Sequence, residues 1–302
     1  MMINIFYKHK NRLPLGSLFL FLLLIVSSCR TSPADHATVH ANDVTSSVAY
    51  PFAASDNKVK QISAHRGGGD ISGYPENCLE SIKYIDEKVG AWMEIDIRET
   101  KDGQLILMHD ASLDRTTSGF GKVASKAYDE IKQLTLKDNE GRMTDYHPPL
   151  LRDVLEWNER EGKTVLNLDI KQDVDYKDVL RLVKETNQMD NVIAIVYTLG
   201  QAKAMRRLND DIVISLPVRN LQEWERLSNS DLPIKNLIAF TGTIRSDKKL
   251  YDILHTEGLL TIFGTMGNID RQAAARGPKV YEQLYDDGAD ILSTDRPLEV
   301  MK

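Results

Sequence analysis

The chain has 302 residues, of which 38 are basic and 44 acidic, and its formal net charge is −6. This acidic balance argues against nucleic acid as a partner, because binding to the phosphate backbone needs a basic surface. The two cysteines are too few for a structural zinc site built on thiolates, so the fold must rest on its hydrophobic core.

The first 28 residues have the pattern of a secretory signal. Three basic residues precede an apolar run over residues 15–26, and small residues follow it. Cys29 comes next and resembles the lipobox cysteine of bacterial lipoproteins, which becomes lipidated. We therefore expect a signal peptide over residues 1–28 and a bacterial lipoprotein outside the cytoplasm, in the periplasm or at the cell surface. The lipid on Cys29 would hold it to the membrane.

Residues 29–58 are rich in Ser, Thr, Ala and Asp and have no sustained apolar period, which predicts a flexible tether. A metal pair at His36 and His40 is the less favoured interpretation of that segment. Residues 59–302 suit one (β/α)8 barrel in length, although two domains of about 120 residues would also fit. If Cys29 carries lipid, Cys78 has no partner for an intrachain disulfide.

From residue 59 onward, short β-branched apolar runs alternate with helical patterns. This alternation is typical of a parallel sheet covered by helices, and eight such strands close a barrel without an edge. We expect strands at residues 62–64, 91–97, 164–170, 192–197, 212–218, 237–241, 259–263 and 289–293. We expect helices near residues 78–86, 150–158, 179–183, 202–208, 250–254 and 280–285, with Pro75 marking the start of the first.

One more apolar run, residues 104–109, follows the second strand after only three residues. Parallel strands need a crossover of a dozen or more residues, and Asp102-Gly103 is a favoured two-residue hairpin turn. We therefore expect an antiparallel hairpin inserted after the second strand. With Asp102 and Gly103 as the loop, Asp96 would lie directly opposite His109.

Polar residues gather where the predicted strands end, on the face that carries the active sites of barrel enzymes. Glu94 and Asp96 project from the same face of one strand, and Asp169 and Lys171 do so from another. Three carboxylates with few nitrogen or sulfur ligands nearby suit Mg²⁺ or Ca²⁺. The alternative is that Glu94 and Asp169 form ion pairs with Arg66 and Lys171, with no metal.

His65 and His109 are the candidate acid and base, because each stands at the end of an extended run beside charged residues. His147 and His255 lack such a setting and are interpreted as surface or loop residues. The glycines at 67–69 either cradle an anion with their N–H groups or form a flexible turn.

The motifs HRG, PEN, E-x-D, T-x-DG, HD, L-x-RTT-x-G, DIK and TDRP occur in this order from His65 to Pro297. Their order resembles the glycerophosphodiester phosphodiesterase family. The resemblance implies a TIM barrel with an insertion after its second strand, and hydrolysis of a small phosphodiester to glycerol 3-phosphate and an alcohol. The site that it implies consists of a catalytic pair (His65, His109), ligands of one divalent cation (Glu94, Asp96, Asp169), phosphate-binding groups (Arg66, Lys171) and supporting residues near the metal (Glu76, Asn77).

The chain departs from the family pattern at three places. Asp169 stands where the family usually has Glu, and Cys78 where it has Ser or Thr. Residues 263–266 read Phe-Gly-Thr-Met where the family tends to carry Trp-Thr beside the alcohol pocket. The alcohol is therefore left open. Two alternatives stand beside the main interpretation: a phospholipase-like enzyme acting on lysophospholipid or sphingolipid headgroups, and a non-catalytic ligand-binding surface lipoprotein.

Overall fold

A computed structural model of the chain describes residues 60–162 and 164–300. The predicted signal peptide, Cys29 and nearly all of the predicted tether lie outside the described residues. Within the described ranges, no helix has both the length and the apolar character that crossing a bilayer requires.

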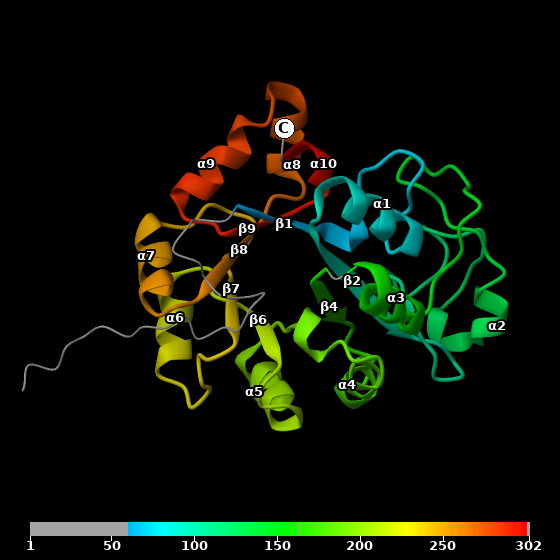
Figure 1. Ribbon diagram of the computed structural model, residues 1–302, viewed down its shortest axis with the longest axis horizontal. Coiled ribbons are helices and arrows are strands. Elements are labelled where there is room, and N and C mark those ends of the chain that lie inside the picture. Colours follow the sequence, from blue (N-terminus) through cyan, green and yellow to red (C-terminus); the bar gives the residue numbers. More distant parts are fainter. Residues whose placement is uncertain (1–59, 163, 301–302) are drawn as a thin grey trace, which may run out of the picture. The chain divides into compact units, whose positions relative to one another are not determined.

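The described chain builds a closed ring of eight parallel strands, in the order β1-β2-β4-β5-β6-β7-β8-β9 and back to β1 (Figure 1). The prediction of a (β/α)8 barrel is confirmed, and each observed strand overlaps a predicted one. The strands are β1 (Gln61–Ala64), β2 (Trp92–Glu99), β4 (Leu166–Ile170), β5 (Val192–Ile195), β6 (Val213–Pro217), β7 (Leu237–Phe240), β8 (Leu260–Gly264) and β9 (Ile291–Thr294).

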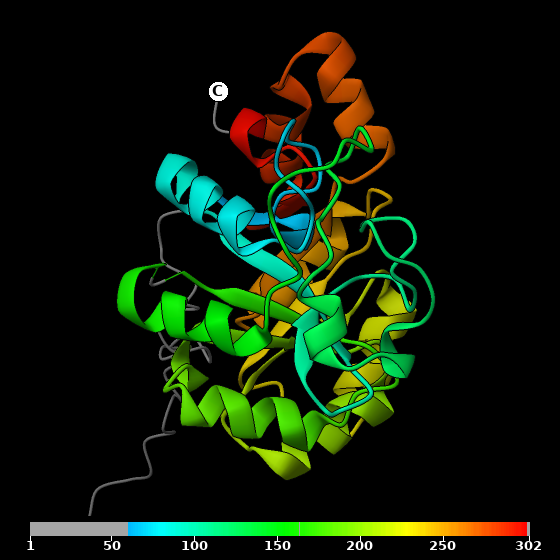
Figure 2. The ribbon, with the colours of Figure 1, turned by 90° about the vertical axis from the view of Figure 1, so that its right-hand side faces the viewer.

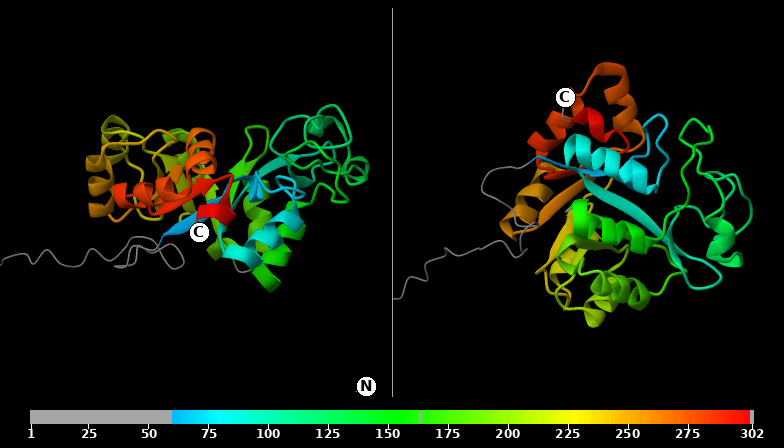
Figure 3. Two further views of the ribbon diagram at one scale, coloured as in Figure 1. Left: turned by 90° about the horizontal axis from the view of Figure 1, so that it is seen from above. Right: turned by 45° about the vertical axis from the view of Figure 1, so that its right-hand side comes forward.

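Helices surround the ring of strands (Figures 1 and 3). Those that follow the predicted apolar faces are α1 (Leu79–Val89), α3 (Leu151–Trp157), α4 (Tyr176–Glu185), α5 (Leu199–Leu208), α7 (Lys248–Thr256) and α9 (Lys279–Asp287). Four further helices were not predicted: α2 (Tyr128–Ile131), α6 (Leu221–Ser228), α8 (Asn268–Arg276) and α10 (Pro297–Val300). Each of them buries only one apolar side chain, and these are Ile131, Leu227, Ala273 and Pro297 in turn. The first helix begins at Leu79 and not near Pro75, because Asn77 has a left-handed φ of 53°.

Side chains along each strand alternate between the surrounding helices and the barrel interior. On β2, Met93, Ile95 and Ile97 pack against the helices, whereas Trp92 belongs to a separate buried cluster inside the ring. Polar side chains enter the interior above this cluster, toward the carboxyl ends of the strands. The interior cluster consists of Trp92, Val165, Ile193, Val213, Ile238, Leu260, Ile262 and Ile291.

The predicted hairpin after the second barrel strand is present, with β3 (Leu105–Leu107) antiparallel to β2. Its predicted register is wrong by one residue: Ile97 pairs with Leu107, and the N–H of Met108, not His109, donates to the Asp96 carbonyl. The turn has three residues, 101–103, because Gly103 adopts a φ of 77° and adds one position to the two-residue turn.

The chain between β3 and α3 forms an excursion at the side of the barrel, with α2 at its outer end (Figures 1 and 2). It has a small core of its own, made by Ile106, Met108, Leu113, Val123 and Ile131. The excursion therefore gives His109 a support that is separate from the barrel core.

Candidate active site

The three predicted carboxylates meet at the carboxyl ends of β2 and β4. Asp96 and Asp169 are neighbours in the parallel register, and Glu94 lies two residues before Asp96 on the same face. One oxygen from each of the three lies within 4.8 Å of the others, and all three residues are buried. The prediction that they share one face is confirmed.

Lys171 is the cation inside this cluster. Its Nζ lies 2.5 Å from Asp96 Oδ1 and 2.6 Å from Asp169 Oδ2. Burial opposes the charge of Lys171, but the two carboxylates outweigh it and raise the pKa. Burial likewise opposes ionisation of Asp96, but Lys171 and Asn77 outweigh it and hold the pKa below its ordinary value.

Glu94 is the carboxyl group of the cluster that Lys171 does not neutralise. Burial, and next the charge of Asp96, raise its pKa to about 8. The predicted alternative without a metal therefore accounts for only part of the cluster. Lys171 does pair with Asp169, but the Arg66 guanidinium pairs with Glu76, and only the Arg66 backbone N–H reaches Glu94, at 2.7 Å.

The cluster has the chemistry of a site for a hard divalent cation. Its donors are all carboxylate oxygens, which Mg²⁺ and Ca²⁺ prefer. The buried Oδ1 of Asp169 has no hydrogen-bond partner, although Oδ2 of the same carboxylate accepts from the Tyr197 hydroxyl at 2.7 Å. A bound cation would give this buried oxygen a partner and would offset the repulsion among the crowded carboxylates.

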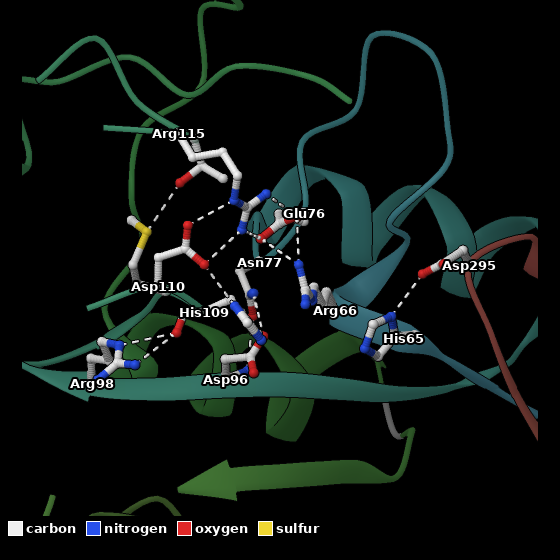
Figure 4. Close-up of polar contacts among 12 residues, drawn as sticks. His65, Arg66, Glu76, Asn77, Asp96, Arg98, His109, Asp110, Arg115 and Asp295 are labelled. Atoms are coloured by element: carbon white, nitrogen blue, oxygen red, sulfur yellow. Dashed lines mark hydrogen bonds and ion pairs between the residues drawn. The ribbon is translucent and has the colours of Figure 1, made fainter. Parts of the chain in front are cut away.

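His65 follows the end of β1, and its ring points to Asp295 (Figure 4). Its Nδ1 lies 2.7 Å from Asp295 Oδ1, and its Nε2 lies 4.0 Å from Glu94 Oε2. Burial lowers the pKa of His65, but the bond to Asp295 and the charge of Glu94 outweigh it and raise the pKa above its ordinary value. The surroundings of His65 therefore favour its protonated form.

Asp295 follows β9 and is held in place by the buried Asp270. The Asp295 N–H donates to Asp270 Oδ2 at 3.0 Å. The other oxygen, Oδ1, accepts from the hydroxyls of Tyr281 and Thr294, each at 2.9 Å. Because Asp270 belongs to α8, this helix and β9 together position the carboxylate behind His65.

The glycines after His65 form a tight turn. Gly68 has a φ of 109°, and a Cβ there would lie 2.2 Å from the Ile85 side chain. The N–H groups of Gly68 and Gly69 both donate to the His65 carbonyl, so they are engaged within the turn. This use favours the turn over an anion cradle.

His109 stands at the start of the excursion, and its ring points to Asp110 (Figure 4). Its Nδ1 lies 2.7 Å from Asp110 Oδ1, and the Arg98 guanidinium donates to its carbonyl at 2.9 and 3.0 Å. The Arg115 guanidinium holds the pKa of Asp110 well below its ordinary range, and the bond from His109 adds to the effect. Asp110 thus shares its charge between a histidine and an arginine.

Glu76 and Asn77 tie the excursion and the barrel together. Arg115 donates to both oxygens of Glu76, at 2.7 and 2.9 Å, and Arg66 donates to the same carboxylate at 3.1 Å. Asn77 donates to Asp96 Oδ2 at 2.7 Å and accepts from the Asp96 backbone N–H at 2.9 Å. Asn77 therefore orients one carboxylate of the cluster.

Four residues of this site carried no predicted role: Asp295, Asp110, Arg115 and Tyr197. The first three lie within the TDRP, HD and L-x-RTT-x-G motifs. The sequence therefore pointed to these residues, but it did not show which residues they contact. Tyr197 ends the fourth predicted barrel strand, and its position on the active face was the available signal.

The remaining predictions near the site have mixed outcomes. His147 is exposed in a loop, as predicted. His255 is also at the surface but belongs to α7, where its Nε2 lies 3.0 Å from Asp290 Oδ2. At the family's Trp-Thr position, Phe263 packs outward among Val280 and other residues of the helices, while Met266 faces the site.

Comparisons with known proteins agree on one relationship. The pattern of the Glycerophosphoryl diester phosphodiesterase family matches residues 65–291. The protein YqiK of Bacillus subtilis (strain 168) is 34% identical over 247 residues, which are 78% of this chain and 95% of that protein. A glycerophosphodiester phosphodiesterase of Bacillus altitudinis is 32% identical over 80% of this chain and 97% of its own length. The crystal structure of a glycerophosphoryl diester phosphodiesterase from Parabacteroides distasonis superimposes with a TM-score of 0.76 at 29% identity, over 82% of this chain and 87% of that one.

Proposed function

The chain belongs to the glycerophosphoryl diester phosphodiesterase family and is a phosphoric diester hydrolase, and from this premise we propose that it converts a glycerophosphodiester to glycerol 3-phosphate and an alcohol. The observation that carries the proposal is that both histidines adjoin one carboxylate cluster: His65 Nε2 lies 4.0 Å from Glu94 Oε2, and His109 follows Met108, whose N–H donates to the Asp96 carbonyl at 3.0 Å. Family membership argues against the alternative of a non-catalytic binding protein.

We propose that Glu94, Asp96 and Asp169 hold one divalent cation, Mg²⁺ or Ca²⁺. When bound, the ion supplies positive charge and Lewis acidity at the phosphate oxygens. Asn77 keeps Asp96 in the orientation that the cluster needs. Asp169 has a shorter side chain than the usual Glu, and the Tyr197 hydroxyl restrains it from the neighbouring strand.

Arg66 and Lys171 are the proposed phosphate-binding residues. Glu76 restrains the Arg66 guanidinium, so the side chain is ordered before the substrate arrives. Lys171 bonds to two cluster carboxylates, and we propose that it exchanges them for a phosphate oxygen when the cluster is loaded.

We propose His65 as the general acid and His109 as the general base. In the described residues no lysine or arginine pairs with Asp295, so its full charge acts on His65 and supports the imidazolium. Asp110 pairs with the Arg115 guanidinium as well as with His109, and on this difference we assign His109 as the base. An acid that protonates the leaving oxygen must carry a proton at the working pH, and a base must not.

A metal-dependence assay tests this proposal. Glycerophosphocholine hydrolysis should stop in EDTA, return with Mg²⁺ or Ca²⁺, and exceed hydrolysis of intact lysophosphatidylcholine. Asp169→Ala should weaken cation binding in calorimetry, whereas Asp252→Asn, which removes an exposed carboxylate on α7, should not. Full turnover by protein shown to be metal-free would contradict the metal site. Faster hydrolysis of the lipid would favour the phospholipase-like alternative.

We also propose that Cys29 carries a lipid. This lipid would anchor the protein to a bacterial membrane, with the protein outside the cytoplasm. The basis is the signal pattern before Cys29 in the sequence. Cys29→Ser should leave the protein in the soluble fraction of cells, whereas Cys78→Ser should leave it with the membranes. Retention of the Cys29→Ser variant on salt-washed membranes would contradict the anchor.

A further inference from the structure

A cavity of about 320 Å³ opens inside the barrel directly beside the carboxylate cluster. His65, Glu94 and Asp169 form part of its wall, so a molecule in it would touch the proposed catalytic site. The volume lies at the lower end of the range for ligand pockets, which suits a small group and not a long chain.

The wall of this barrel cavity has two chemically different arcs. The neighbouring strands β9, β1, β2 and β4 contribute polar side chains, and the strands β5 to β8 contribute mainly apolar ones. The polar arc consists of Ser293, Ser63, Glu94 and Asn167, and the apolar arc includes Ile195, Phe240 and Ile262. Such a cavity fits a small molecule with carbon atoms on one side and hydroxyl groups on the other.

Asn167 supplies a specific recognition group on the polar arc. The side chain is 2% exposed, and its Nδ2 donates to Ser63 Oγ at 2.8 Å, which fixes the amide. Its Oδ1 is buried and has no hydrogen-bond partner. Buried amide oxygens in folded proteins nearly always accept a hydrogen bond. A molecule bound in the cavity would therefore satisfy this oxygen if it carried a hydrogen-bond donor.

We infer that Asn167 Oδ1 accepts a hydrogen bond from a hydroxyl group on the glycerol half of the diester, when that half lies in the barrel cavity. The inference rests on the proposed function, because it assigns one half of the proposed substrate to a place. Asn167 is a specificity residue here: it recognises the glycerol half and takes no part in proton transfer. A substrate that lacks the hydroxyl leaves the buried oxygen unpaired, which is the strongest way for a site to reject an analogue.

The test compares glycerophosphocholine with propylphosphocholine, measured by choline release. Choline has no hydrogen-bond donor, so only the glycerol half can satisfy Asn167. We expect kcat/KM to favour the glycerol ester by about 10-fold or more in the wild type. Asn167→Leu, which is similar in size but apolar, should bring the two esters to within about 3-fold of each other. An unchanged preference in Asn167→Leu would overturn the inference.

A matched control removes another buried asparagine amide away from the cavity. Asn158 bonds to Thr164 and Gln188 near the start of β4, so Asn158→Leu should lower stability but keep the preference for the glycerol ester. Loss of the preference in this variant as well would assign the effect to general damage and overturn the inference.

A binding measurement separates this inference from the proposed function and does not need a folded Asn167 variant. Calorimetry on the wild type should show glycerol 3-phosphate binding about 10-fold or more tightly than propyl phosphate. Equal affinities would overturn the subsite. Tighter binding of glycerol 3-phosphate without hydrolysis of either ester would uphold the subsite and contradict the proposed diesterase activity.

Discussion

His65 takes its carboxylate partner, Asp295, from a strand end 230 residues away, whereas His109 takes Asp110 from the next position in the chain. Both bonds are 2.7 Å long and both use Nδ1, which leaves Nε2 of each ring for the substrate. The charges behind the two bonds differ: Arg115 pairs with Asp110, and in the described residues no comparable cation pairs with Asp295. The two histidine–aspartate pairs therefore differ in the second neighbour of the carboxylate, and the proposed acid and base roles rest on this difference.

The largest effect that tests this comparison is the loss of either ring. His65→Ala and His109→Ala should each lower kcat for glycerophosphocholine by at least about 100-fold, because each removes an acid–base group. The double variant should fall well short of the product of the two losses, since both groups act in one step. His147→Ala and His255→Ala should remain within a few-fold of wild type. Near-normal turnover in a folded His65→Ala or His109→Ala variant would remove that histidine from the mechanism.

The next effect separates the two pairs. Asp295→Asn and Asp110→Asn should each lower kcat by about 10-fold, because each weakens one charge-assisted hydrogen bond to a ring. The folded pKa of His65 is raised by Asp295, so its acid form survives to higher pH in the wild type. In Asp295→Asn the alkaline limb of the pH–rate profile should therefore move to lower pH, while Asp110→Asn should move it little. The opposite pattern would exchange the roles of the two histidines.

The carboxylate cluster between the two histidines predicts a pH effect on stability in the metal-free protein. Folding raises the pKa of Glu94 from 4.5 to about 8, so the folded protein keeps a proton that the unfolded chain releases. The free energy of unfolding should therefore decline as pH rises from about 5 to about 8. Denaturant titrations should show this decline weakened in Glu94→Gln and in wild type saturated with Mg²⁺ or Ca²⁺. A decline that is unchanged by both would point to another titrating group.

The smallest expected effect concerns the separate supports of the two histidines. Gly103 and Gly90 both have positive φ, at 77° and 59°, and neither is closely crowded. Replacing either by Ala should lower the free energy of unfolding by about 1 kcal/mol, because an L side chain is strained there. Only Gly103→Ala, in the turn of the hairpin whose second strand leads to His109, should also lower kcat, by a few-fold. Equal kcat values in the two variants would show that the turn does not control His109.

Most of the fold could be predicted because its signals are local. Short β-branched apolar runs marked the barrel strands, and the short Asp-Gly link showed that the next strand must turn back. The period-two alternation of side chains along a strand placed Glu94 and Asp96 on one face before any tertiary contact was known. The hairpin register was the exception, because the number of residues in the turn depends on whether Gly103 takes a left-handed conformation.

The sequence by itself determined the barrel, the carboxylates at its strand ends and the two histidines, since these follow from periodicity and from the face on which parallel strands end. The tertiary structure alone decided their partners. Asp295 reaches His65 because ring closure brings β9 beside β1, and Arg115 reaches Glu76 because the excursion folds back over the first loop. The two arcs of the barrel cavity, and the unpaired oxygen of Asn167, likewise exist only once eight strands have closed. Contacts across such distances depend on the joint packing of all the elements, and no short stretch of sequence encodes them.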